Sequence, residues 1–222
     1  MTRNLSTHIQ LPGLPGSAAS LSKHFRRRRW TELNRRFTDL ADMRVIDLGG
    51  YYWNWVSAPV RPKSVVVVNL DGRRFADEPS WVESVTADAC DLPVEVFDRP
   101  FDLVYSNSLL EHVGGYSRRK AIADAVHCLA PHHWVQTPAR YCPIEPHWLC
   151  PGFQFLPARL RLEAARRWPL SPTYRQSDLE QLMEEVLGVE LVSNTEMRHL
   201  FPTSDLYIER IGGIPKSVTA VS

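Results

Sequence analysis

Short runs of apolar residues recur along the middle of the chain and are continuous rather than alternating with polar residues. Continuous runs of this kind are typical of parallel strands that are covered by helices on both faces. The runs lie at 44–48, 65–70, 84–87, 101–106 and 133–137. The pattern therefore predicts an α/β fold built on a parallel sheet.

Helical periodicity accounts for much of the remaining chain. Apolar residues at helical spacing predict an amphipathic helix within 21–40, ahead of the first strand. Another helix is expected to begin at Ser117 as its N-cap, and a further one to run from Ser177 as cap to Gly188 as its stop.

Composition divides the chain into an arm, a main domain and an insertion. Residues 1–20 are rich in Pro, Gly and Ser and predict an extended arm, so 1–40 is interpreted as an arm plus a cap helix. The main domain is expected to span 41–222, with a Pro- and aromatic-rich substrate-binding insertion at about 138–200. The final residues, 205–222, indicate two strands joined by a Gly-Gly-Ile-Pro turn.

Composition also limits the function. The 222 residues carry 26 basic and 25 acidic side chains, and 44% are hydrophobic. This suits a globular domain and argues against a polyanionic partner.

No apolar run approaches the ~20 residues of a membrane span, and the N-terminus lacks the apolar core of a signal peptide. The four cysteines form no CxxC pair, so we expect reduced thiols in a cytoplasmic protein. A homodimer is left open.

One basic cluster, Arg26–Arg29, stands out in this nearly neutral chain. No signature of an RNA-binding module accompanies it, so nucleic acid is not expected as a partner. A solvated or salt-bridging helix face is favoured, and contact with an anionic or oligomeric partner stays open.

Polar and turn-forming residues follow four of the predicted strands. Ligands of open parallel sheets bind beyond the carboxyl ends of the strands, so these residues predict one shared ligand site. They stand in the segments "DLGG", "NLD", "ADACDLP" and "SNSLLEH".

From about Val45 to Gln136 these segments resemble the Rossmann-like S-adenosylmethionine-dependent methyltransferases. The matching motifs are "VIDLGG", "VVVVNLDG", "TADACDLP" and "FDLVYSNSLLEHV". The resemblance implies a Rossmann-like, seven-stranded methyltransferase sheet, mostly parallel with an antiparallel C-terminal hairpin and helices on both faces. It also implies S-adenosylmethionine as the cofactor.

Carried over residue by residue, the resemblance implies that the strand ends hold the methionine part, the ribose and the adenine of the cofactor. The implied positions are Gly49, Gly50 and Ser106 for the methionine part, Asn69 or Asp71 for the ribose, and Asp88 and Ala89 for the adenine, with Asp47 and Leu70 as further cofactor-binding positions. Two departures matter. Tyr51 displaces the second glycine of the family motif, and Asn69 stands where an acid is usual, so Asn69 and Asp71 remain rivals for the ribose.

A dinucleotide-dependent dehydrogenase is the main competitor. Its G-x-G-x-x-G loop presents free amides to a pyrophosphate, and the stretch from Gly49 to Asn54 does not supply that pattern. Because S-adenosylmethionine has no phosphate, the missing glycines count mainly against the dinucleotide.

Beyond the fifth strand, the segment "PIEPH" carries the best candidate for a general base. Pro143 and Pro146 favour extended backbone before them, so Glu145 and His147 should project to the same side. An imidazole can take the proton of an attacking hydroxyl near pH 7. We expect His147 to be that base, with Glu145 orienting it or binding substrate hydroxyls. A rigid structural turn is the competing interpretation.

Residues 137–157, "TPxRYxPIEPHxxxPGFQFLP", resemble a bacterial subgroup of these methyltransferases linked to glycan and polysaccharide O-methylation. The resemblance implies a sugar or oligosaccharide hydroxyl as acceptor. The aromatic residues Tyr141 and Trp148 suit a sugar, and Glu111 and His112, at the turn after the fourth strand, are further substrate-binding candidates. Another small metabolite, phenolic or lipid-linked, and a catalytically silent cofactor-binding regulator are the alternatives. Some O-methyltransferases of this fold use Mg²⁺, for which Glu111, Glu145 or His147 could serve, although no spacing demands it.

Overall fold

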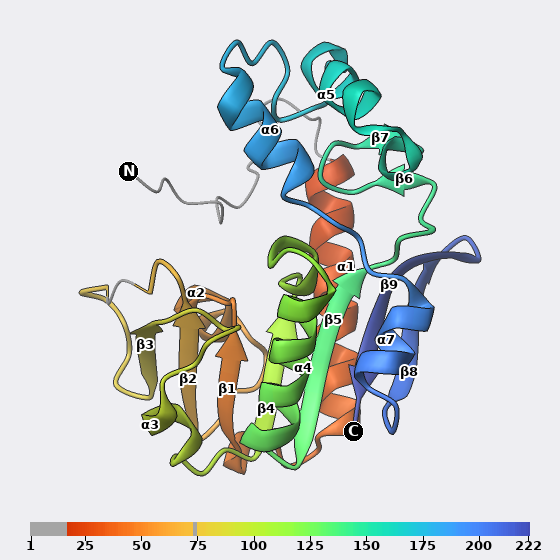
Figure 1. The fold of residues 1–222 in the computed structure, drawn as a ribbon. Helices are drawn as coiled ribbons and strands as arrows, with labels where there is room; N and C mark the ends of the chain where they lie inside the picture. Colours follow the sequence, from red (N-terminus) through yellow and green to blue (C-terminus); the bar gives the residue numbers. More distant parts are fainter. Residues whose placement is uncertain (1–16, 73–74) are drawn as a thin grey trace.

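A computed structural model describes residues 17–72 and 75–222 of the chain (Figure 1). Residues 1–16 of the expected arm lie outside the described residues. The cap helix α1 spans Ser17–Arg36, so 17–20 are helical rather than part of an extended arm.

The central feature is a seven-stranded sheet in the order β3-β2-β1-β4-β5-β9-β8. All five strands predicted from the apolar runs are present and parallel. Their bounds are β1 Arg44–Leu48, β2 Ser64–Asn69, β3 Val82–Thr86, β4 Leu103–Asn107 and β5 His132–Pro138. The predicted fold class is confirmed.

The C-terminal hairpin completes the sheet. Strands β8 (Asp205–Ile211) and β9 (Ile214–Val221) pair antiparallel, and β9 adds antiparallel to β5. Gly212 and Gly213 form the turn at φ values of 55° and 87°, which side-chain-bearing residues rarely adopt. The predicted terminal hairpin is therefore confirmed.

Helices cover both faces of the sheet, and two begin one or two residues away from the predicted cap. Helix α4 (Tyr116–Leu129) is capped by Gly115 rather than Ser117, because the Gly115 carbonyl accepts the first amides of the helix. Helix α6 (Leu179–Leu187) is capped by Asp178, whose carboxylate accepts two backbone amides, and it ends at Gly188 as expected. The shorter helical elements are η1 Leu40–Asp42, α2 Tyr52–Val56, α3 Val94–Phe97, η2 Leu110–His112 and α7 Asn194–Leu200.

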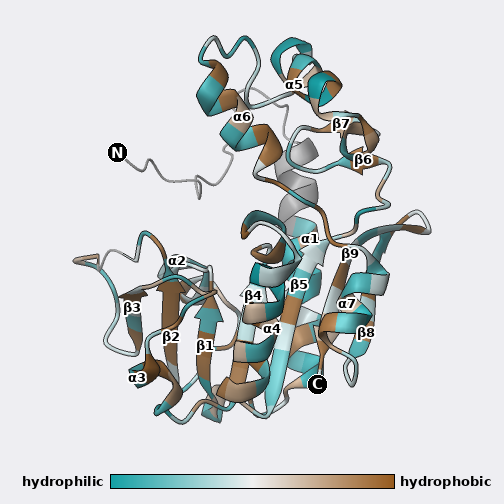
Figure 2. Ribbon diagram, in the orientation of Figure 1, coloured by the Kyte–Doolittle hydropathy of each residue, from teal (hydrophilic) through white to brown (hydrophobic). Residues whose placement is uncertain are grey.

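Two apolar cores lie on opposite faces of the sheet, and β2 between them is hydrophobic along most of its length (Figure 2). One core includes Ile46, Val104 and Ile122 of α4. The other includes Leu33 of α1, and Trp30 of the same helix stacks on Tyr105 of β4 with ring planes 3° apart. The arginine-bearing helix is thus fixed to the sheet by its apolar side.

The expected insertion forms a small layer above the carboxyl ends of β4 and β5 (Figure 1). It contains the hairpin β6 (Ile144–Glu145) and β7 (Cys150–Pro151), the turn η3 (Phe153–Phe155) and helix α5 (Ala158–Arg167), followed by α6. It has its own buried cluster, which includes Trp148, Phe153 and Leu182. None of the helices that the structure describes is both long and apolar enough to cross a membrane.

Candidate active site

The loop after β1 is closed so tightly that only glycine fits at its centre. Gly49 has a φ of 82°, and a Cβ atom there would lie 2.7 Å from the Leu109 side chain. A Cβ at Gly50 would lie 1.9 Å from the Asp47 carboxylate. The loop therefore exposes backbone close to the carboxyl edge of the sheet, as its proposed role beside the methionine part of a cofactor requires.

The aromatic stretch that follows this loop stabilises it. Trp55 donates its indole N–H to Oδ2 of Asp47 at 2.7 Å, and both side chains are buried. Burial raises the pKa of Asp47 to about 7, against the opposing effect of the Trp55 hydrogen bond. Asp47 is therefore a buried anchor beneath the loop, and the interaction with Trp55 was not predicted from the sequence.

The two ribose candidates have different surroundings. Asn69 is 8% exposed, and its amide donates to the carbonyl oxygens of Gly49 and Gly50 at 3.3 and 3.1 Å. Its carbonyl accepts the backbone N–H of Asp71 at 3.3 Å. Asn69 thus braces the glycine loop, while Asp71 lies at the turn beyond β2 with Leu70, which is 72% exposed.

The third strand end holds the adenine candidates. Asp88 accepts the backbone N–H of Cys90 at 2.9 Å and pairs with Arg118 of α4 at 2.7 Å. Burial opposes ionisation of Asp88, but these hydrogen bonds outweigh it and lower the Asp88 pKa. Ala89 beside it is buried. The ionised carboxylate remains an acceptor at the same edge of the sheet as the glycine loop.

The fourth strand end is reached by an arginine from the N-terminal helix. Ser106 is fully buried and donates to the carbonyl of Leu48 at 3.0 Å, which ties β4 to β1. Arg29 donates to the side chains of Asn107 at 2.7 Å and Gln136 at 3.1 Å. The sequence pointed to the arginine run as a whole and not to Arg29. Arg29 precedes Trp30, a buried apolar residue of the same helix, and this neighbour could have indicated which arginine lies next to the sheet.

Glu145 and His147 form a hydrogen-bonded pair, but His147 lies in the turn that follows β6 and not in the extended backbone that the sequence predicted. The Oε1 atom of Glu145 lies 2.6 Å from Nδ1 of His147, while Oε2 accepts the backbone N–H groups of His147 and Trp148. Burial opposes the charged form of His147, but the hydrogen bond and charge of Glu145, with the charge of Glu111, outweigh it and raise the His147 pKa. The pairing leaves Nε2 of the ring for other contacts.

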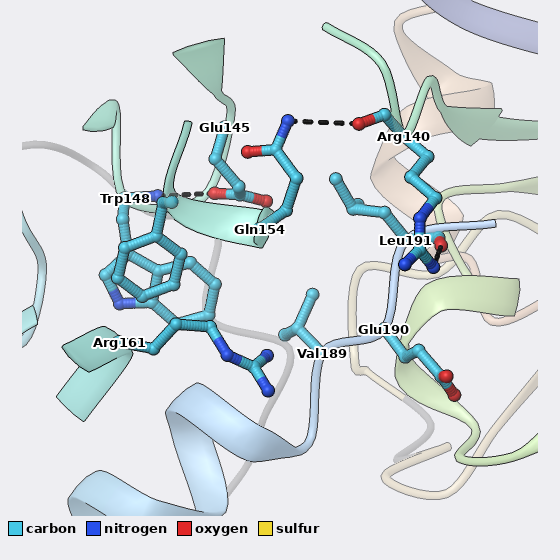
Figure 3. A pocket seen from close by; sticks show the side chains of 9 residues that line it. Arg140, Glu145, Trp148, Gln154, Arg161, Val189, Glu190 and Leu191 are labelled. Carbon is cyan, nitrogen blue, oxygen red and sulfur yellow. Dashed lines mark hydrogen bonds between the residues drawn. The ribbon is translucent and has the colours of Figure 1, made fainter. Parts of the chain in front are cut away.

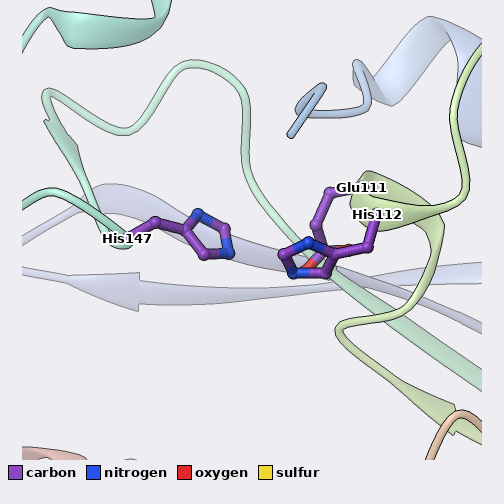
Figure 4. A group of neighbouring side chains, drawn as sticks. All are labelled: Glu111, His112 and His147. Atoms are coloured by element: carbon purple, nitrogen blue, oxygen red, sulfur yellow. The ribbon is translucent and has the colours of Figure 1, made fainter. Parts of the chain in front are cut away.

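Glu111 and His112 lie opposite that ring (Figure 4). The rings of His112 and His147 have centroids 5.0 Å apart and are nearly perpendicular. Glu111 is fully buried and accepts the hydroxyl of Thr137 at 2.9 Å, and burial raises its pKa. Burial and the neighbouring His147 lower the pKa of His112 to about 4, so its ring is neutral at neutral pH. The fold thus brings together four residues that the sequence predicted for the substrate side: Glu111, His112, Glu145 and His147.

A cavity of about 130 Å³ lies within the insertion, and of the four residues of this group only Glu145 lines it (Figure 3). Trp148 and Phe153 stack in its wall with centroids 4.6 Å apart. Among the described residues, Oε1 of Gln154 and Nε of Arg161 are buried without a hydrogen-bond partner. The full lining is Arg140, Glu145, Trp148, Phe153, Gln154, Arg161, Val189, Glu190 and Leu191. Tyr141 is 62% exposed and stacks on Phe155, outside this lining.

The side chains of this region do not fit the Mg²⁺ that the sequence analysis considered. Mg²⁺ requires octahedral coordination by oxygen and usually keeps several waters beside one or two carboxylates. The one group of described residues that could hold a metal offers two imidazole nitrogens and a single carboxylate, from His112, His147 and Glu111. Mg²⁺ is therefore not supported.

The parallel sheet with its antiparallel hairpin and tight glycine loop defines a Rossmann-like enzyme fold. A scan against protein families matches residues 22–194 to a family described as a methyltransferase domain. The chain belongs to this family and is a methyltransferase. A search of the curated proteins gave no match.

Several solved structures with the same fold are methyltransferases of different kinds, and a putative Zn-dependent alcohol dehydrogenase from Rhodobacter sphaeroides shares it as well. The N-methyltransferase NodS from Bradyrhizobium japonicum WM9 is 14% identical, with a TM-score of 0.51 over 89% of this chain and 94% of NodS. An S-adenosylmethionine-dependent methyltransferase from Mesorhizobium loti is 18% identical, with a TM-score of 0.52 over 86% of this chain and 95% of its own. Magnesium protoporphyrin IX methyltransferase from Synechocystis PCC 6803 is 11% identical, with a TM-score of 0.51 over 94% and 88%. At these identities the similarity shows the fold alone.

Proposed function

We propose that the chain transfers a methyl group from S-adenosylmethionine to a hydroxyl of a sugar or oligosaccharide, with His147 as the general base. The observation that carries the proposal is the Glu145–His147 hydrogen bond of 2.6 Å, in which Glu145 also lines the cavity of the insertion. NodS, which shares the fold, has been solved with S-adenosylhomocysteine, the product of such a donor.

The donor would lie along the strand ends that carry Gly49, Asp71 and Asp88. The loop at Gly49 admits close backbone approach, Asp71 could hold the ribose hydroxyls, and ionised Asp88 could accept from the adenine amino group. Because Asn69 already braces the loop, Asp71 is the preferred ribose ligand. Ser106 contributes by holding β1 and β4 together at the methionine end.

The reaction needs alignment and the removal of one proton. The acceptor oxygen attacks the sulfonium methyl in line, the C–O bond forms as the C–S bond breaks, and neutral S-adenosylhomocysteine leaves. The hydroxyl proton passes to Nε2 of His147, and Glu145 stabilises the resulting imidazolium through Nδ1. The pair thus performs the step that a neutral hydroxyl requires.

The cavity supports a polyhydroxyl acceptor. Trp148 and Phe153, buried and stacked on each other, form the apolar part of its wall. Gln154 and Arg161 carry buried polar atoms that no described residue satisfies, and such groups favour a ligand rich in hydrogen-bonding atoms. Tyr141, at the surface, could contact the outer part of a longer oligosaccharide.

Two measurements test the proposal. Calorimetry with S-adenosylhomocysteine should detect binding, and its absence at high micromolar concentration would refute the donor assignment. Labelled S-adenosylmethionine is then supplied with sugar, phenolic and amine acceptors. Transfer should occur on the sugar hydroxyl and fall by ~10²–10⁴-fold in His147→Ala, the range that a general base contributes. His132→Ala is the matched control, since His132 lies at the opposite end of β5.

The outcome separates the alternatives. Preferred transfer to the phenol or amine would replace the sugar assignment, and wild-type rates in His147→Ala would remove the base assignment. A chain that binds S-adenosylhomocysteine but methylates none of the acceptors would favour the silent regulator.

A further inference from the structure

Three potential metal ligands from two separate segments converge beside the proposed acceptor position. One carboxylate oxygen of Glu111 and one ring nitrogen each of His112 and His147 all lie within 4.8 Å of one another (Figure 4). Glu111 and His112 follow β4, whereas His147 belongs to the insertion. The Nε2 atom of His112 is 3.9 Å from Oε1 of Glu111, which is too long for a hydrogen bond.

The carboxylate of Glu111 is incompletely satisfied. Its side chain is 0% exposed, and Oε2 accepts the Thr137 hydroxyl. Its other oxygen, Oε1, is buried and has no hydrogen-bond partner among the described residues. A buried carboxylate oxygen without a partner is costly, and a cation between the three side chains would relieve that cost.

Two of the three side chains are held by groups outside the cluster. Glu145 binds Nδ1 of His147, which leaves Nε2 turned toward His112. The Thr137 hydroxyl binds Glu111 at the oxygen that does not face His112. In metal sites, a carboxylate on the far nitrogen of a histidine ligand orients the ring and raises its basicity.

A second histidine pair in the same protein shows what distinguishes this cluster. The rings of His127 and His133 are 5.5 Å apart and meet at 85°, close to the geometry of His112 and His147. Nε2 of His127 contacts the Leu200 carbonyl, and both nitrogens of His133 contact serine hydroxyls. Three of the four ring nitrogens of that pair are therefore engaged, and the pair is not part of a group that could hold a metal among the described residues.

We propose that Glu111, His112 and His147 bind one divalent transition-metal ion of the Zn²⁺ type. Two imidazoles and a carboxylate suit Zn²⁺, which accepts three protein ligands and keeps a further position open. Bonds of ~2.0–2.2 Å require the ligand atoms to draw closer than they stand. His112 can make this movement because its side chain is 36% exposed.

Metal binding regulates the same site, a consequence that rests on the proposed function. Zn²⁺ would occupy Nε2 of His147, the nitrogen that accepts the substrate proton. A bound metal and an active base therefore exclude each other, and Zn²⁺ acts as an inhibitor.

The metal site is tested without any methyl transfer. Protein stripped with a chelator is titrated with Zn²⁺ by calorimetry and with Co²⁺ by visible absorption. One ion should bind per chain. His112→Ala and Glu111→Gln each remove a direct ligand, so binding should weaken by at least the ~10–100-fold that follows loss of a residue hydrogen-bonded to a ligand. His127→Ala should bind as the wild type does. No binding to the wild type, or unchanged binding in His112→Ala, would overturn the site.

The inhibitory role has its own measurement. Transfer by the wild type should fall as Zn²⁺ is added, with a midpoint that matches the calorimetric affinity, and a chelator should restore it. Transfer that is insensitive to Zn²⁺, or that requires it, would overturn inhibition. If the chain transfers no methyl group at all, the proposed function fails, whereas the titrations still decide the metal site.

Discussion

The indole of Trp55 donates a hydrogen bond of 2.7 Å to the buried carboxylate of Asp47, directly beneath the glycine loop. The other carboxylate oxygen, Oδ1, has no hydrogen-bond partner among the residues that the structure describes. Trp55 is thus the principal polar support of a side chain that shapes the loop.

Trp55→Phe should destabilise the protein by ~1–3 kcal/mol beyond the loss of ring volume, because it leaves a buried carboxylate without its donor. Trp134→Phe is the matched control. Trp134 is also fully buried, and its indole nitrogen has no partner within the described part of the chain. Urea unfolding of both variants isolates the hydrogen bond, and equal losses of stability would contradict its importance.

The raised pKa of Asp47 predicts a pH-dependent stability. Its folded-state pKa is about 7, while an unfolded aspartate titrates near ~3.9. Between these values the unfolded chain releases a proton that the folded chain keeps, so stability declines as pH rises from about 4 to about 7. Asp47→Asn removes this contribution. As the pH rises from about 4 to about 7, the melting temperature of the wild type should fall more steeply than that of Asp47→Asn. Parallel plots of melting temperature against pH would refute the raised pKa of Asp47.

Gly50→Ala should disturb the loop, because the new Cβ would meet the Asp47 carboxylate at 1.9 Å. Overpacking of this kind costs ~1–3 kcal/mol, and we expect S-adenosylhomocysteine binding to weaken at least tenfold in calorimetry. Gly115→Ala is the control, since nothing lies within 4 Å of a Cβ at that position. Equal behaviour of the two variants would argue against a tight loop.

Arg119 connects α4 to the segment that returns from the insertion. It is 4% exposed and pairs with Glu190 at 2.8 Å and with Glu196 at 2.6 Å. Arg119→Ala should cost ~1.5–3 kcal/mol. The exposed pair of Arg167 with Glu163 provides a contrast, and Arg167→Ala should change stability by less than ~0.5 kcal/mol. Chemical denaturation distinguishes the two, and a similar small loss in both would contradict the prediction.

The sheet could be predicted from sequence because its information is local. The continuous run at 65–70 suits a strand covered on both faces and little else. The proximity of Glu145 and His147 was also predicted, although a turn and not extended backbone brings the two side chains together. Both features depend on residues that are neighbours in the chain.

The cavity could not be predicted, because its walls meet only after separate parts of the insertion pack together. Arg140 and Arg161 are separated from Glu190 by helices whose packing no local pattern specifies. The role of Asn69 was also undecided, since a strand-end amide can serve a ligand or a neighbouring loop equally well. Only its contacts with the carbonyls of Gly49 and Gly50 favour the second role.

The aromatic pair at the start of α2 has an optical consequence. Tyr51 and Trp53 stack at 4.3 Å with ring planes 10° apart, next to the loop at which the donor is proposed to enter. Indole emission responds to changes in nearby polarity and charge. Trp53 is one of seven tryptophans, so its response to donor binding is expected as the part of the fluorescence change that is lost in Trp53→Phe.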